Sequence, residues 1–163
     1  MQSSDAGHFV AKCVDTSTSL TRFSRVLAID PGVKYLGFAF ATGGQIIRCG
    51  YLPDIKDAAF LKTLNAQICI LEKPVQYAGS KAPRADISDL SMATGRIEAL
   101  VGCPRTLLWA PYEWKGQTPK DIHQARIVAC LLPDEKSQLP EAKGHRGHVI
   151  DACGMLLKYM RRL

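Results

Sequence analysis

The sequence contains no long apolar run and no recognisable leader. None of its 163 residues belongs to a stretch of about eighteen apolar residues, the length that a transmembrane helix needs. The first apolar block, residues 26–29, is too short for the core of a secretory signal and ends at an aspartate. The sequence therefore predicts a cytoplasmic protein with no membrane partner.

Closely spaced cysteines are also missing. The six cysteines lie 20 or more residues apart, and no C-x-x-C pair occurs. This spacing excludes zinc ribbons and dithiol redox motifs. Most of the cysteines stand in apolar runs, where a thiol in a reducing compartment behaves as a small hydrophobic side chain. We expect them to belong to the core.

No internal repeat and no domain linker divides the chain, and its length is that of one domain. Hydrophobic residues make up 47% of the sequence and charged residues 22%, which is typical of a globular protein and excludes a disordered or fibrous class. Residues 1–24 are rich in serine and threonine and have no periodicity. They predict a flexible N-terminal extension before a single folded domain over residues 25–163.

The charge is unbalanced toward the basic side. Lysine and arginine number 21 against 15 acidic residues, which gives a formal net charge of +6. A basic excess suits a polyanionic partner such as DNA or RNA. A soluble basic protein with no such partner fits the same number, so charge alone decides nothing.

The apolar patterns predict three strands followed by alternating helices and strands. Expected strands cover 25–30, 35–41, 45–52, 67–71 and 106–110, with a hairpin turn at 42–44; expected helices cover 56–65, 87–101, 118–132 and 147–161, with a polar loop at 133–146. This order is typical of an α/β fold with a five-stranded mixed sheet flanked by helices.

Two acids terminate apolar strands of this expected sheet. Asp30 ends the first strand and Glu72 follows the fourth. If the two strands are parallel neighbours, both carboxylates lie at the carboxyl edge, where open α/β sheets place their sites. His148 and Asp151 share a face of the last helix at spacing i, i+3 and can converge on them. Carboxylate oxygens in this number suit Mg²⁺ or Mn²⁺, and two such ions can clamp a phosphodiester during hydrolysis.

Each of these residues has a simpler interpretation when taken singly. Asp30 before Pro31 and Gly32 is typical of a turn, Glu72 can pair with Lys73, and His148 can be a helix-start residue. Their joint occurrence, in this order and on these elements, favours a metal site.

With these motifs the sequence resembles the RuvC-type Holliday-junction resolvases of the RNase H-like nuclease superfamily. The resemblance covers most of residues 25–160 and depends on V-L-A-I-D-P-G at 26–32, Gly37, I-L-E at 70–72 and H-x-x-D-A at 148–152. It implies the RNase H-like fold, metal binding by Asp30, Glu72 and Asp151, and a fourth ligand position at His148.

The resemblance also implies contacts to DNA. Lys115, and more loosely Lys120, correspond to basic residues near the cleaved phosphate. The loop at 76–88 carries Tyr77, Lys81 and Arg84 and is a candidate DNA-contacting loop, although a plain surface loop fits it equally well. Many family members place an aromatic wedge soon after the glutamate, where this chain has Pro74 and Val75.

We therefore expect a Mg²⁺-dependent endonuclease that resolves four-way DNA junctions as a homodimer through the helix at 87–101. An RNase H-like nuclease acting on RNA or other branched nucleic acid, and a junction-binding protein without catalysis, remain alternatives. Actin-like and sugar-kinase ATPases also open with a strand ending in Asp-x-Gly, but they need two such domains, and this chain is too short.

Overall fold

The computed structural model describes residues 24–76, 84–141 and 143–163. A five-stranded sheet in the order β3-β2-β1-β4-β5 forms its centre. The strands are β1 (Val26–Pro31), β2 (Leu36–Thr42), β3 (Gln45–Leu52), β4 (Ile68–Glu72) and β5 (Thr106–Trp109), and the helices are η1 (Ile55–Leu64), α2 (Arg84–Val101), α3 (Pro111–Trp114), α4 (Lys120–Cys130), α5 (Pro133–Ser137) and α6 (Lys143–Tyr159). The first three strands are antiparallel, and β4 and β5 run parallel to β1. The mixed five-stranded sheet expected from the sequence is confirmed.

The hairpin between β2 and β3 is as tight as the sequence predicts. Thr42 pairs with Gln45, so only Gly43 and Gly44 form the loop. Both glycines have positive φ, 61° and 80°. Two central residues of positive φ define the turn that matches strand twist, and glycine adopts it without steric cost.

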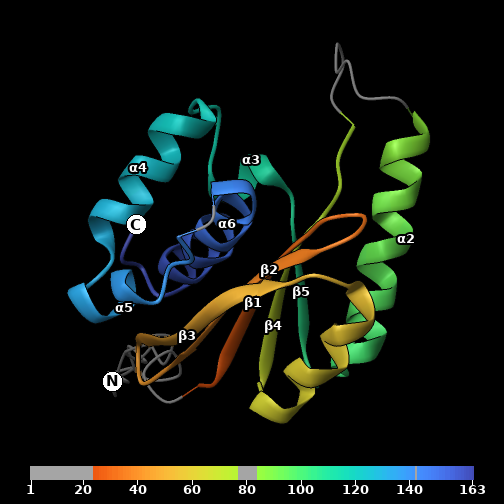
Figure 1. Ribbon diagram of the computed structural model, residues 1–163, viewed down its shortest axis with the longest axis horizontal. Helices are drawn as coiled ribbons and strands as arrows, with labels where there is room; N and C mark the ends of the chain where they lie inside the picture. The colour runs from red at the N-terminus through yellow and green to blue at the C-terminus, as the bar shows by residue number, and fades with distance from the viewer. Residues whose placement is uncertain (1–23, 77–83, 142) are drawn as a thin grey trace, which may run out of the picture.

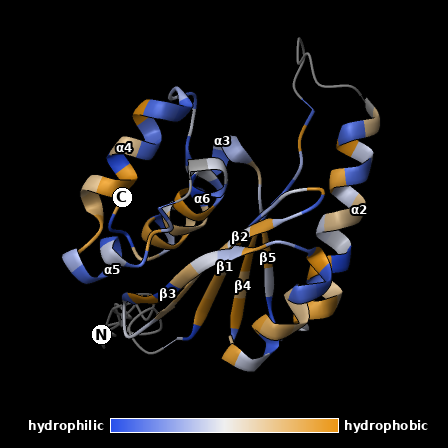
Figure 2. Ribbon diagram, in the orientation of Figure 1, coloured by the Kyte–Doolittle hydropathy of each residue, from blue (hydrophilic) through white to orange (hydrophobic). Residues whose placement is uncertain are grey.

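The sheet is covered on both faces, which explains why its central strands are continuously apolar. Helices α3 to α6 gather on one side and α2 with η1 on the other (Figure 1). Alternate residues of β1 point to opposite faces of the sheet. Val26 and Ala28 pack toward α6, whereas Leu27 and Ile29 pack toward η1 and α2. Hydrophobic residues accordingly concentrate along the strands and on the helix surfaces that face them (Figure 2).

Helix α6 is the most deeply buried helix in the described part of the chain. Its residues from Val149 to Leu157 are all buried, which is typical of a helix surrounded by protein. It lies so close to β2 that a Cβ on Gly37 would stand 2.3 Å from the carbonyl carbon of His148. Glycine at position 37 therefore fixes how near α6 approaches the sheet.

Three of the expected helices begin elsewhere or take another form. The helix expected at 87–101 begins at Arg84, so part of the expected loop at 76–88 is helical. The segment expected as an α-helix at 56–65 is a 3₁₀ helix, which ends at Asn65 in the left-handed conformation. The helix expected at 118–132 is shorter at both ends, since α4 begins at Lys120, without a side-chain cap, and ends at Cys130.

The expected polar loop at 133–146 is wrong as well. It contains α5 and the first turn of α6. The cause is Glu135, which is buried and accepts hydrogen bonds from Arg162, at 2.7 Å to each carboxylate oxygen, and from the backbone amides of Ile46 and Leu132, both at 2.8 Å. These contacts reach 89 residues back along the chain to β3, so no local pattern reveals them.

Cysteine burial follows the expectation in part. Cys69 and Cys153 are buried, whereas Cys49, Cys103 and Cys130 are only partly buried; all five are free thiols. Cys13 and nearly all of the expected extension at 1–24 lie outside the described residues. No helix in residues 24–76, 84–141 or 143–163 is long and apolar enough to cross a membrane.

Candidate active site

The first two acids lie side by side because β1 and β4 are parallel neighbours. Ile29 pairs with Leu71 in the register, so Asp30 and Glu72, each the next residue, end their strands at the same edge. Asp30 is buried and Glu72 is partly buried. A carboxylate that leaves water loses hydration, and it needs positive or hydrogen-bonding partners to remain charged.

Asp30 receives its partner from α6. The Nδ1 atom of His148 lies 2.6 Å from the Oδ2 atom of Asp30. Burial raises the pKa of Asp30, as does the charge of Asp151, while His148 and Lys115 act in the opposite direction. The hydrogen bond to Asp30 raises the pKa of His148, which favours the imidazolium facing the carboxylate.

Glu72 is held by α3 and the residue that follows it. Its Oε2 atom accepts hydrogen bonds from the indole Nε1 of Trp114 at 2.9 Å and from the Nζ of Lys115 at 3.2 Å. Burial raises the pKa of Glu72, the charge of Asp30 raises it further, and Lys115 and Trp114 oppose this shift. The negative charges of Asp30 and Glu72 therefore interact at the sheet edge.

Asp151 is buried on α6, one turn after His148. Gln124 of α4 donates through Nε2 to its Oδ1 at 3.0 Å and to the carbonyl of Gly147 at 3.1 Å. Lys120, one turn earlier on α4, lies 3.7 Å from its Oδ2 atom. The α4 residues therefore fix the rotamer of Asp151.

The structure places the expected acids close enough for their charges to interact, but their side chains are not arranged to bind a metal ion. Among the described residues, no group of three or more His, Cys, Asp or Glu side chains is arranged to hold a metal ion. Each carboxylate is instead turned toward a cation or an N–H donor of this chain. The donor set itself, three carboxylates and an imidazole, suits a hard divalent cation. Burial is the main cause of the raised pKa values of Asp30 and Glu72, and a neighbouring carboxylate adds to each.

Of the expected DNA-contacting residues, two are placed. Lys115 and Lys120 lie at the acid cluster, each on a carboxylate. Tyr77 and Lys81 lie outside the described residues, and Arg84 begins α2 with a side chain that is not described.

Two residues that position the acids are not identified as such by the sequence. Trp114 is as compatible with a buried anchor as with a base-stacking platform, and the structure makes it an anchor, 4% exposed, that donates to Glu72. Gln124 follows Lys120 at spacing i, i+4, so the two share a helix face. The spacing can be seen in the sequence, but the sequence does not show that this face of α4 contacts Asp151 of α6.

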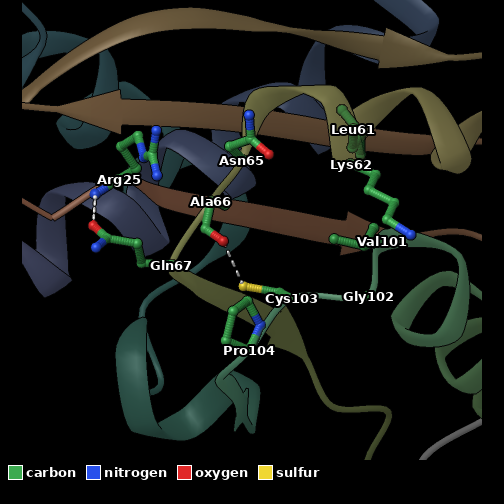
Figure 3. A pocket seen from close by; sticks show the side chains of 10 residues that line it. All are labelled: Arg25, Leu61, Lys62, Asn65, Ala66, Gln67, Val101, Gly102, Cys103 and Pro104. Carbon is green, nitrogen blue, oxygen red and sulfur yellow. Dashed lines mark hydrogen bonds between the residues drawn. The ribbon is translucent and has the colours of Figure 1, made fainter.

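A hollow at the other end of the sheet is distinct from this cluster. It has a volume of about 260 Å³ and lies where β1, β4 and β5 begin (Figure 3). Arg25 donates its backbone N–H to Gln67 there at 3.0 Å, and the thiol of Cys103 donates to the carbonyl of Ala66 at 3.2 Å. No acid lines it, and parallel strands place their sites at the opposite edge.

Comparison with known proteins supports the fold. No protein-family model matches the sequence, and no curated protein sequence matches it. Thermus thermophilus RuvC in complex with a Holliday-junction substrate is 16% identical, with a TM-score of 0.58 over 83% of this chain and 91% of that chain. The yeast mitochondrial Holliday-junction resolvase Ydc2 is 13% identical, with a TM-score of 0.53 over 90% of this chain and 82% of that chain. The chain therefore has the RNase H-like α/β fold of the RuvC-type resolvases.

Proposed function

We propose that this chain is a structure-selective endonuclease that cleaves four-way DNA junctions by metal-dependent phosphodiester hydrolysis. The observation that carries the proposal is the cluster of Asp30, Glu72 and Asp151 at the carboxyl edge of the two central parallel strands. The RuvC fold supports the choice of substrate, since RuvC is known in complex with a Holliday junction.

Asp30, Glu72, Asp151 and His148 would hold the metal. Two bound Mg²⁺ or Mn²⁺ ions would supply electrostatic stabilisation of the attacking and leaving oxygens. The Nδ1 atom of His148 is engaged by Asp30, so its Nε2 atom would either complete the metal site or orient the attacking water. Lys115 neutralises charge that develops on the phosphate.

The basic residues at the cluster are proposed DNA contacts. Lys115 and Lys120 contact the acids, and we propose that they bind the DNA strand that is cut. Tyr77, Lys81 and Arg84 remain proposed DNA contacts. The free thiols of the described cysteines are in keeping with a reducing compartment such as the cytoplasm.

Paired cuts in a four-way junction require two active sites related by a two-fold axis, so we propose a homodimer. On α2, Ala93 is only 5% exposed, so it is buried in its own chain and is not available to a partner. The outer face of α2 instead presents Ser88, Met92, Gly95 and Ala99, all exposed, at spacings of three or four residues. Met92 is 66% exposed.

A charge on that outer face tests the dimer. Met92→Glu should lower the mass of the protein in solution to that of one chain, and junction cutting should fall from paired cuts to single nicks. Asp86→Lys, also exposed on α2 but about 120° around the helix from Met92, is the control. A wild-type protein that stays monomeric on junction DNA would contradict the dimer.

A second function is favoured by one specific observation. Every acid of the cluster is already paired with a cation or an N–H donor of this chain, and the described residues form no three-ligand metal group. A junction-binding protein without catalysis would look the same. A nuclease acting on RNA would also share the fold.

One experiment separates the three. Purified protein is incubated with a four-way junction, a flap, a linear duplex and an RNA–DNA hybrid, with and without Mg²⁺. Selective, Mg²⁺-dependent cutting of the junction supports the proposal. Tight junction binding without cutting in Mg²⁺ or Mn²⁺ points to the binding protein, and preferential cutting of the hybrid points to an RNA-directed enzyme.

A further inference from the structure

A second cavity is lined in part by Trp114 and Lys115. It has a volume of about 280 Å³ and is formed by α3, the residues that follow it, α4 and the carboxyl-terminal end of α6. These elements lie together on one side of the sheet (Figure 1). None of the acids of the candidate active site lines this cavity.

The cavity contains a buried imidazole with an unused polar atom. His123 is 4% exposed, and its Nε2 atom is buried with no hydrogen-bond partner among the described residues. The ring packs edge-on against Trp114, with centroids 5.2 Å apart. Burial lowers the pKa of His123, so the ring is neutral and Nε2 can donate or accept. The ring lines the cavity, so its NMR signals can report on a ligand that binds there.

The remaining charges in the cavity are mostly positive. Arg126 and Lys158 line it, and the side chain of neither is hydrogen-bonded or ion-paired with any described residue. The one acid among the described lining residues, Glu113, is already engaged, because its Oε2 atom accepts the backbone N–H of Ala110 at 2.5 Å. The cavity therefore offers donors and positive charge to an anion.

Lys115 connects this cavity with the candidate active site. It lines the cavity, its Nζ lies 3.2 Å from Glu72, and it lies over the Trp114 ring at 4.9 Å from the centroid. Along α6, Lys158 follows Asp151 by seven residues, or about 10 Å of helix. A strand of a duplex carries one phosphate per roughly 3.4 Å of axis, so this separation corresponds to about three phosphates.

We propose that the cavity binds a phosphate group through Arg126 and Lys158, beside the His123 ring, and that the phosphate belongs to the nucleic-acid strand that passes the acid cluster. The guanidinium of Arg126 suits two-pronged contact with phosphate oxygens, and the ammonium of Lys158 adds a second positive charge. The strand assignment rests on the proposed function, whereas phosphate binding itself does not.

Histidine-labelled protein and inorganic phosphate provide the direct test. Titration followed by NMR should shift the His123 imidazole signals in a saturable way at millimolar phosphate. Arg126→Gln should weaken this binding about tenfold or more. Arg105→Gln, an exposed arginine at the opposite end of the sheet, should leave it unchanged. Absence of a His123 shift, or an equal affinity in Arg126→Gln, would overturn the proposal.

A second arm identifies the source of the phosphate. A junction strand without metal should displace inorganic phosphate from wild-type protein, and Arg126→Gln should raise KM for junction cleavage while leaving kcat near the wild-type value. If phosphate binds but DNA does not displace it, the cavity serves a small phosphate ligand and the strand assignment is wrong. If phosphate and DNA both bind but no substrate is cut, the nuclease function fails while the phosphate site stands.

Discussion

Gly37 offers a sharp test of the candidate active site because it lies outside the acid cluster and yet determines its geometry. An added Cβ would stand 2.3 Å from the carbonyl carbon, 2.4 Å from the carbonyl oxygen of His148 and 2.6 Å from the amide of Val149. All three are backbone atoms, so no side-chain rotation relieves the clash. Ordinary van der Waals contact begins near 3.4 Å, and Gly37→Ala must therefore move α6 outward by about 1 Å.

That displacement acts on the contact between His148 and Asp30, which is 2.6 Å long. A shift of about 1 Å in a catalytic group can cost about 100-fold in rate. Overpacking should also cost about 1–3 kcal/mol of unfolding free energy. We therefore expect single-turnover cleavage of a four-way junction to slow by about two orders of magnitude, with little change in junction binding, because the basic residues are untouched.

Gly50→Ala is the matched control. It also lies in this sheet, on β3, but its added Cβ would meet only the ring of Phe38, at 3.3 Å, and that side chain can move. Measurements below the unfolding range of both variants separate the rate from the stability. Wild-type cleavage by Gly37→Ala, or equal losses in both variants, would refute the reasoning.

Three other changes test the acids, the histidine and the fold. Asp30→Asn should abolish cleavage and retain junction binding in a gel-shift assay; retained activity would remove Asp30 from the site. His148→Ala should slow cleavage, and His148→Asp should keep much of the rate, since either side chain can hold a metal or a water; normal cutting by His148→Ala would make His148 a plain helix-start residue. Arg162→Ala should lower the unfolding free energy in urea by about 3 kcal/mol, because it leaves Glu135 buried without its cation, whereas the exposed Arg105→Ala should change it by less than about 0.5 kcal/mol.

Glu135 also sets an expected pH dependence. Burial alone would raise its pKa, but the hydrogen bonds from Arg162, Leu132 and Ile46 hold that pKa below its ordinary value. A depressed folded-state pKa adds stability above the unfolded pKa, near 4.3, and this stability is lost as the pH falls through the folded value. Glu135→Gln lacks this contribution. Its unfolding free energy, measured in urea, should therefore fall less steeply as the pH is lowered than that of the wild-type protein.

The sequence predicts the sheet because each strand carries its own signal. The block at 26–29 is apolar on both faces, and the glycine pair at 43–44 favours a tight turn. Asp30 and Glu72 follow from the same signals, since strand ends are visible in the sequence and parallel neighbours share an edge. Predicting that these two acids lie close together therefore requires only the fold class.

Contacts between distant segments could not be predicted in this way. Glu135 is polar and lies in a polar stretch, and only Arg162 and the amide of Ile46 make its burial favourable. Gln124 and Trp114 are likewise ordinary helix residues until α6 and β4 are placed beside them. Hydrogen bonds of this kind depend on tertiary packing, which hydrophobic periodicity does not encode.

The pairing of charges at the acid cluster constrains how any cation can bind there. Asp30, Glu72 and Asp151 face His148, Lys115 and Lys120, so three acids meet three basic side chains. A divalent cation must compete with Lys115 for Glu72 and with Lys120 for Asp151, because each lysine contacts an oxygen of its acid. Both lysines would then lose their partners, and a phosphate of the bound strand is the anion best placed to replace them. Metal binding and DNA binding should therefore reinforce each other in this protein, since each supplies charge that the other leaves uncompensated.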